Sequence, residues 1–223
     1  MFIALLTLIF FVAMVASLAA QVYVSYVFGK WGAVENGAKL TGTQVVERIQ
    51  DKAGLTAQLQ AGDKRTGDHY DPRSHTVYLT EQIAEKPSVL AMAVTAHELG
   101  HAQQHQENSG LIQMRSLLVP AVQLSPTIAY ALVTAGLFFG FFRLIWLGAF
   151  VFGLVVAFMF LTLPVEVDAS RRGVLLLREI GVISNREDRR GIHQVLTAAA
   201  LTYVAASVLS LSQLLRYISL ARR

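Results

Sequence analysis

The segment AVTAHELGHAQQHQEN, residues 93–108, carries three histidines at four-residue steps, and a glutamate directly follows the first of them. His97, Glu98 and His101 fit the pattern His-Glu-x-x-His. Residues four apart share one face of an α-helix, so both imidazoles can bind the same Zn²⁺. Glu98 then lies beside the open coordination position, where a carboxylate can accept a proton from water. The pattern predicts a hydrolytic zinc site on a helix.

The third histidine, His105, continues the same helix face, but it lies about 12 Å along the helix from His97, too far to share one ion. The metzincin pattern also fails here, because Gln104 stands in place of its glycine and Glu107 in place of its third histidine. We therefore expect His105 to be a polar surface residue or a support for the site.

A third metal ligand must be His, Asp or Glu, because the chain has no cysteine. Glu166 and Asp168 qualify, since they directly follow an apolar stretch at a depth where carboxylates are costly and usually functional. We prefer Glu166. The alternative is that these carboxylates form an interfacial salt bridge with Arg171 or Arg172.

The composition is that of a membrane protein. Apolar residues make up 54% of the chain and charged residues 15%, against about 25% charged in soluble domains. Four apolar stretches, residues 1–28, 117–140, 144–163 and 195–215, are long enough to span a bilayer. The first has no charged side chain and is interpreted as a retained anchor. The second stretch either contains two prolines or begins beyond Pro126. The alternative interpretation for all four stretches is that they are buried helices of a soluble bundle.

The polar segment between the first two apolar stretches has α+β patterning. It predicts a helix capped by Thr43 and ended by Gly54, strands near 55–60 and 75–80, and a helix capped by Ser88 that carries the zinc motif. The predicted fold is mainly α: a polytopic membrane protein with about four transmembrane helices and a small α+β zincin-like insert at the membrane surface. The expected division is an anchor (1–28), the insert (29–115), a transmembrane hairpin (116–164), a third-ligand helix and connection (165–194), and a fourth span with a basic tail (195–223).

The chain also resembles the YugP-type family of membrane zinc metallopeptidases, which are gluzincin-like and distantly similar to HtpX peptidases. The resemblance implies one bound Zn²⁺, with Glu166 as third ligand, and a place in the bacterial plasma membrane. Ser170 departs from the pattern, because those relatives have an aspartate there that orients a zinc-bound histidine. The motifs that carry the resemblance are DHYDPR (68–73), AHELGHAQQH (96–105), MRSLLVP (114–120), TLPVEVDASRR (162–172) and VLTAAALTYVAA (195–206).

The reaction expected from this site is hydrolysis of peptide bonds, with Glu98 as general base. His69 and Tyr70 are candidates to stabilise the oxyanion and His193 is a third, although DHYD can also be a simple hydrogen-bonded turn. HTVYLT, residues 75–80, is a candidate edge strand onto which a peptide substrate adds.

Topology and charge give the expected surroundings of the site. Two spans separate the zinc helix from Glu166, which puts both on the same side of the membrane. Most of the 19 Lys and Arg residues lie on that side, so the positive-inside rule favours a cytoplasmic active site. The expected partners are the lipid bilayer and membrane proteins or peptides near it; no basic, aromatic-rich run indicates nucleic acid, and other partners are left open.

A rival interpretation is a membrane scaffold or adaptor with a structural or vestigial zinc site. Glu98 discriminates between the two, because a structural site needs no carboxylate beside an open position. A transporter is disfavoured, since the apolar stretches hold few ionisable residues.

Overall fold

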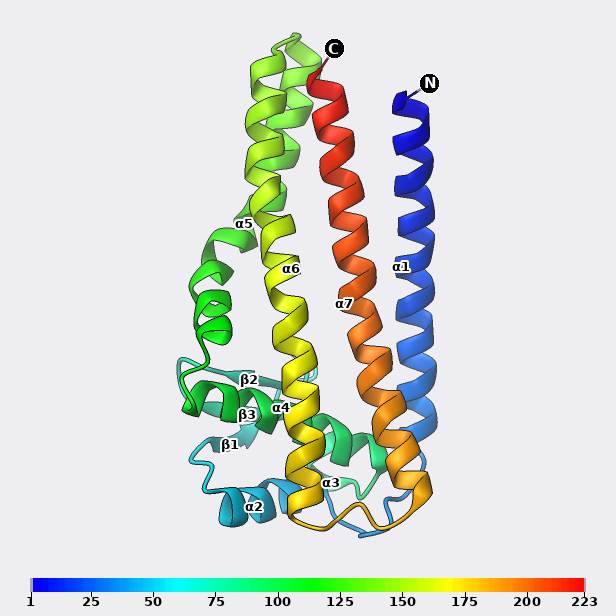
Figure 1. Cartoon of the computed structure of the whole chain (residues 1–223), viewed down its shortest axis with the longest axis vertical. Coiled ribbons are helices and arrows are strands. Elements are labelled where there is room, and N and C mark those ends of the chain that lie inside the picture. The colour runs from blue at the N-terminus through cyan, green and yellow to red at the C-terminus, as the bar shows by residue number, and fades with distance from the viewer. Residues whose placement is uncertain (1, 223) are drawn as a thin grey trace. The chain divides into compact units, whose positions relative to one another are not determined.

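The structure is a computed structural model that describes residues 2–222, most of which are helical (Figure 1). It confirms the predicted class, a mainly α protein with a small α+β part. The elements in chain order are α1 (Phe2–Gly32), α2 (Gly42–Ala53), β1 (Gln58–Ala61), β2 (His69–Asp71), β3 (Thr76–Leu79), α3 (Glu81–Glu85), α4 (Val89–Gln106), α5 (Gly110–Phe139), α6 (Phe142–Glu179) and α7 (Arg186–Ala221).

Four of these helices are long and apolar enough to cross a membrane, namely α1, α5, α6 and α7. In the most apolar stretch of each helix, only 17% to 33% of the residues are buried, and large side chains such as Phe138 and Phe150 are exposed. Contiguous exposed apolar surface of this extent is typical of helices that face lipid. The zinc-motif helix α4 is not among the four candidates.

The long helices extend further than the apolar stretches alone predict. Helix α5 contains both Pro120 and Pro126 and does not begin after them. Helix α6 continues past Pro164 without interruption, so Glu166 lies on the same helix as the third apolar stretch. A short turn joins α5 to α6, with Gly140 in the left-handed conformation at φ 70° that glycine adopts without strain.

The chain divides into two compact units. One comprises the apolar ends of the long helices, residues 2–22, 114–164 and 201–222. Within it, α5 and α6 pack closely, because a β-carbon on Gly148 would lie 2.9 Å from the carbonyl oxygen of Ala129. The other unit comprises residues 23–113 and 165–200, and it contains the sheet, the zinc-motif helix and the Glu166 segment.

In this second unit, the sheet has the strand order β1-β3-β2, with β1 parallel and β2 antiparallel to β3. The expectation that HTVYLT forms an edge strand is therefore wrong, because β3 is the central strand. One edge is β2, a three-residue strand within the turn-rich DHYD segment. Its short length and polar residues conceal it from a search for alternating apolar residues.

The helices of the insert are capped by local hydrogen bonds. The predicted cap of α2 is wrong by two residues: Thr41 accepts a hydrogen bond from the Gln44 amide, and Gln44 Oε1 accepts one from the Thr41 amide. Thr43 lies inside the helix and donates to the carbonyl oxygen of Ala84. The other caps are as predicted, with Gly54 left-handed after α2 and Ser88 accepting from Ala91 at the start of α4.

Candidate metal centre

Helix α4 presents the two motif histidines side by side. The ring centroids of His97 and His101 are 4.8 Å apart, in an edge-to-face arrangement. The Ser88 cap sets where the helix begins, and sheet and helix residues bury most of its length. His101 is buried, and the His97 side chain keeps 16% of its surface exposed.

Glu166 reaches these histidines from α6. Its Oε2 lies 3.2 Å from His97 Nε2 and 3.5 Å from His101 Nε2. One ligand atom from each of the three residues falls within 4.8 Å of the others, a separation that allows one metal ion to be bound by all three. Glu166 itself is 2% exposed, so its carboxylate is a buried charge that requires a positive partner.

Two glycines allow α6 to approach α4 this closely. A β-carbon on Gly100 would overlap the carbonyl oxygen of Ala169, and one on Gly173 would lie 2.6 Å from that of Ala96. The contact is reciprocal, since each helix contributes one glycine and one fully buried alanine. These two contacts hold the main chains of α4 and α6 together beside the three ligand residues.

The outer nitrogens of both imidazoles are held by neighbouring side chains. Ser170 Oγ lies 3.1 Å from His97 Nδ1, and Gln104 Oε1 lies 3.0 Å from His101 Nδ1. Gln104 in turn donates to the carbonyl oxygen of Val165 and to Asp168. These contacts fix the ring orientations, as hydrogen bonds behind metal-bound histidines commonly do.

The donor set fits a zinc ion. Because Gln104 Nε2 is committed to two acceptors, its oxygen faces His101, and this contact requires a proton on Nδ1 of the imidazole. Nε2 of neutral His101 then carries a lone pair that points toward the Glu166 carboxylate. Two imidazole nitrogens and a carboxylate that converge on one point match the donors that zinc takes when no cysteine is present.

Asp168, the other candidate ligand, faces away from this cluster. Its Oδ2 accepts from Arg172 Nε at 2.7 Å and from Gln104 at 2.8 Å, and Arg172 also reaches Glu107 at 2.6 Å. Asp168 therefore forms the salt bridge that was the alternative interpretation for these carboxylates. It supports His101 through Gln104, whereas Glu166 is the carboxylate at the histidines.

Glu98 follows His97 on α4 and is 8% exposed. Asp68 lies within its electrostatic range and accepts hydrogen bonds from the backbone amide and hydroxyl of Thr80. Burial raises the pKa of Asp68 above its ordinary value, the Thr80 hydrogen bonds oppose this shift, and the charge of Glu98 adds to it. The DHYD segment thus brings a second carboxyl group near the proposed base.

The two candidate oxyanion donors point in different directions from β2. His69 stacks on Tyr78, with ring centroids 4.9 Å apart, and its Nδ1 lies 3.1 Å from the carbonyl oxygen of Gly67. The Tyr70 hydroxyl lies 2.6 Å from Nδ1 of both His75 and His105. Both groups are therefore held by protein contacts, and their role in stabilising an oxyanion stays a prediction.

Three residues at the site were not singled out as parts of it from the sequence: Gln104, Ser170 as a hydrogen-bond partner, and His75. A signal for the first exists, because Gln104 is three residues after His101 and such a pair shares a helix face. No sequence signal identifies His75, because its contact with Tyr70 depends on the register of β2 against β3. The structure also accounts for His105, which supports Tyr70 instead of binding with His97.

Comparison with known proteins gives the family of the chain. The family described as "Putative neutral zinc metallopeptidase" matches residues 6–222, and the chain belongs to that family. A relative from Bacillus subtilis (strain 168), described as "Putative membrane protease YugP", is 39% identical over 200 residues, which cover 89% of this chain and 88% of the relative. No solved structure matched the chain.

Proposed function

We propose that this protein is a membrane-bound zinc endopeptidase that hydrolyses peptide bonds in membrane or membrane-proximal proteins. The observation that carries the proposal is the convergence of His97, His101 and Glu166, and Glu98 directly follows His97 on α4. His97, His101 and Glu166 would hold one zinc ion. A zinc ion held in this way activates water for attack and polarises the carbonyl group of the scissile bond.

The residues of the chain have separate roles in this proposal. Glu98 accepts a proton from the attacking water and delivers it to the leaving amine, which is the ordinary work of a carboxylate placed beside the metal ligands. Ser170 and Gln104 keep the two imidazoles oriented. His69 and Tyr70 are the candidates from β2 to contact the substrate, and β2, as an edge strand of the sheet, offers main-chain groups to an extended peptide.

The proposed location of the site is the cytoplasmic face of a bacterial plasma membrane. The apolar helices α1, α5, α6 and α7 supply the anchor, and the relative from Bacillus subtilis is described as a membrane protease. The basic residues of the insert and of the α6–α7 connection favour the cytoplasmic side.

The decisive experiment compares zinc content and peptide hydrolysis in the same purified samples. Glu98→Gln should keep zinc and lose turnover by at least about a hundredfold, since general acid–base catalysis contributes about 10²–10⁴ in rate. Glu166→Ala and His97→Ala should lose zinc and turnover together. Glu81→Gln, an exposed carboxylate on α3, serves as the matched control and should change neither.

Two outcomes would contradict the proposal. If Glu98→Gln cleaves casein and a membrane-derived peptide as fast as the wild type, Glu98 is not the base. If wild-type protein with bound zinc cleaves neither substrate, the metal is structural and the scaffold interpretation stands.

A further inference from the structure

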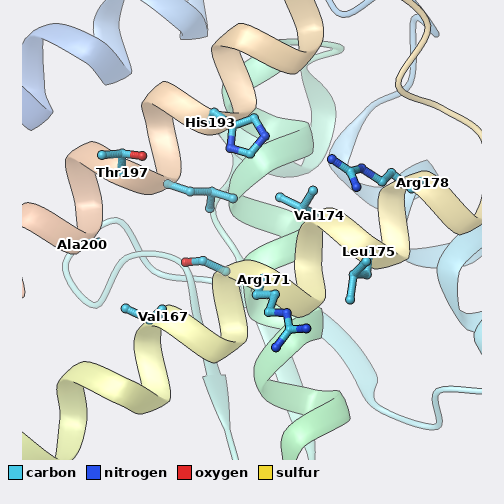
Figure 2. Close-up of a pocket in the computed structure, with 10 residues that line it drawn as sticks. Val167, Arg171, Val174, Leu175, Arg178, His193, Thr197 and Ala200 are labelled. Carbon is cyan, nitrogen blue, oxygen red and sulfur yellow. The ribbon is translucent and has the colours of Figure 1, made fainter.

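A groove of about 550 Å³ lies between α6 and α7, and Figure 2 shows the side chains that line it. Its walls are mostly apolar, with Val167 and Val174 from α6 and Leu196 and Ala200 from α7. The volume is within the roughly 300–1,000 Å³ of ligand sites. The groove is therefore large enough to receive an extended chemical group.

Three basic side chains line the same groove: Arg171 and Arg178 from α6, and His193 from α7. The two arginines differ from their neighbour Arg172, which is neutralised by Asp168 and Glu107. Within residues 2–222, neither Arg171 nor Arg178 makes an ion pair. The nearby Asp168 acts on Arg171 only beyond ion-pair distance. The groove thus combines apolar walls with uncompensated positive charge.

The positive charge extends along α6 from Arg178 to Arg171, and beyond Arg171 the groove ends at the apolar residues Val167 and Ala200. Six residues connect the end of α6 to the start of α7, so the two helices run antiparallel. Figure 2 shows His193 near Val174 and Arg178, and Ala200 toward Val167. From Arg178 to Val167 is eleven residues, roughly 16 Å of helix. From this apolar end, α6 and α7 continue into the parts that are apolar enough to cross a membrane.

The groove is also behind the metal centre. Its wall includes Ser170, whose Oγ lies 3.1 Å from His97 Nδ1. The nitrogen of His97 that faces Glu166 is the other one, Nε2. An occupant of the groove would thus contact the support of a metal ligand and not the side of the ring where a scissile bond would react.

We propose that this groove binds one anionic phospholipid of the surrounding bilayer. The anionic headgroup lies along Arg178, His193 and Arg171, and an acyl chain follows the apolar walls past Arg171 toward Val167 and Ala200. Basic pockets between membrane helices recognise anionic headgroups through this same combination of charge and apolar surface. Because Ser170 forms part of the wall, lipid occupancy stabilises the Ser170–His97 contact and thereby the orientation of His97.

The test is native mass spectrometry of the full-length protein in detergent, titrated with phosphatidylglycerol or with phosphatidylcholine of the same acyl chains. The wild type should retain one phosphatidylglycerol in preference to phosphatidylcholine. The double variant Arg171→Gln/Arg178→Gln should bind phosphatidylglycerol about thirtyfold more weakly, because each arginine near an anionic headgroup contributes about fivefold. Ala200→Trp, which fills the apolar end, should weaken retention of both lipids.

The matched control is Arg189→Gln/Arg190→Gln, which removes two exposed charges from the start of α7 outside the groove. It should retain phosphatidylglycerol like the wild type. Equal loss in the two double variants, or equal retention of the two lipids by the wild type, would overturn the proposal. So would unchanged lipid retention in Arg171→Gln/Arg178→Gln together with weaker binding of an acidic peptide, because the occupant would then be a peptide. Melting temperatures without added lipid check that each variant is folded.

Discussion

Gly100 of α4 lies directly against the main chain of Ala169 in α6, so close that a β-carbon on Gly100 would come within 3.0 Å of the Ala169 carbonyl carbon and overlap its oxygen. Gly173 makes the reciprocal contact with Ala96. Glu166 is three residues from Ala169, and His97 and His101 flank Gly100 within one turn on either side. The distance between the histidines and the glutamate therefore depends on this glycine contact.

Gly100→Ala should push the two helices apart. We expect a loss of about 1–3 kcal/mol in unfolding free energy from overpacking and a clear loss of bound zinc. The measurements are zinc content and melting temperature of the purified protein. Gly153→Ala on α6 is the matched control, because its β-carbon would meet nothing within 4 Å and the change should be neutral or stabilising. Full zinc occupancy in Gly100→Ala would show that the close contact does not position the ligands.

Ser170 provides the second prediction, because its hydroxyl contacts the outer nitrogen of His97. Ser170→Ala should lower zinc affinity by about 10–100-fold, the usual cost of losing a hydrogen bond behind a metal ligand. Ser170→Asp should keep or strengthen binding. Competition with a chelator of known affinity measures the effect. Thr197→Ala removes a hydroxyl from the same groove without touching His97, so an equal effect there would assign the loss to general packing.

The sequence predicted these site residues unequally well, for physical reasons. Spacing alone selected His97 and His101, because a helix fixes which residues share a face. Glu166 was predicted for two reasons. A carboxylate next to an apolar stretch is costly and therefore usually functional, and two intervening spans put Glu166 on the same side of the membrane as the zinc helix. Gln104 was treated only as a departure from another motif, since its partners Val165 and Asp168 are on a distant part of the chain.

The fold shows the same limit. Hydropathy located the four apolar helices, because length and apolar content decide that property locally. It did not locate β2 or the central position of β3, which depend on pairing between strands and not on the pattern within one strand. Hydropathy also did not predict that the third helix continues to Glu179. The segment after Pro164 carries charged residues on one face and packs against α4 with the other, so it is not apolar throughout.

The Tyr70–His75–His105 cluster makes the stability of the insert depend on pH. Burial lowers the pKa of His75 below its ordinary value of 6.5, and His105 lowers it further. Below pH of about 6.5 the unfolded chain therefore binds a proton at His75 that the folded protein does not, so stability decreases as pH falls. Burial also raises the pKa of Tyr70 well above its ordinary value, which keeps the hydroxyl protonated throughout.

The measurement is the melting temperature between about pH 7.5 and pH 5.5, compared with His75→Asn. Asparagine suits the left-handed backbone at this position, where φ is 51°, and it can still hydrogen-bond to Tyr70. The variant should lose less stability on acidification than the wild type. Because the two proteins share every other titratable group, only the difference between the two slopes is assigned to His75. Identical slopes would show that His75 does not contribute to the pH dependence of stability.

Membrane orientation can be measured directly because the chain has no cysteine. Gln60→Cys places a thiol on the exposed edge strand β1, and Phe141→Cys places one in the exposed turn between α5 and α6. The short α5–α6 turn is followed by one arginine, Arg143, whereas the α6–α7 connection is bordered by Arg178 and Arg186 and the insert carries further basic residues. The positive-inside rule thus predicts that a membrane-impermeant maleimide labels Phe141→Cys in intact bacteria and Gln60→Cys only after lysis. Labelling of Gln60→Cys in intact cells would place the metal centre on the outer face of the membrane. Cytoplasmic segments of membrane proteins could then not be its substrates.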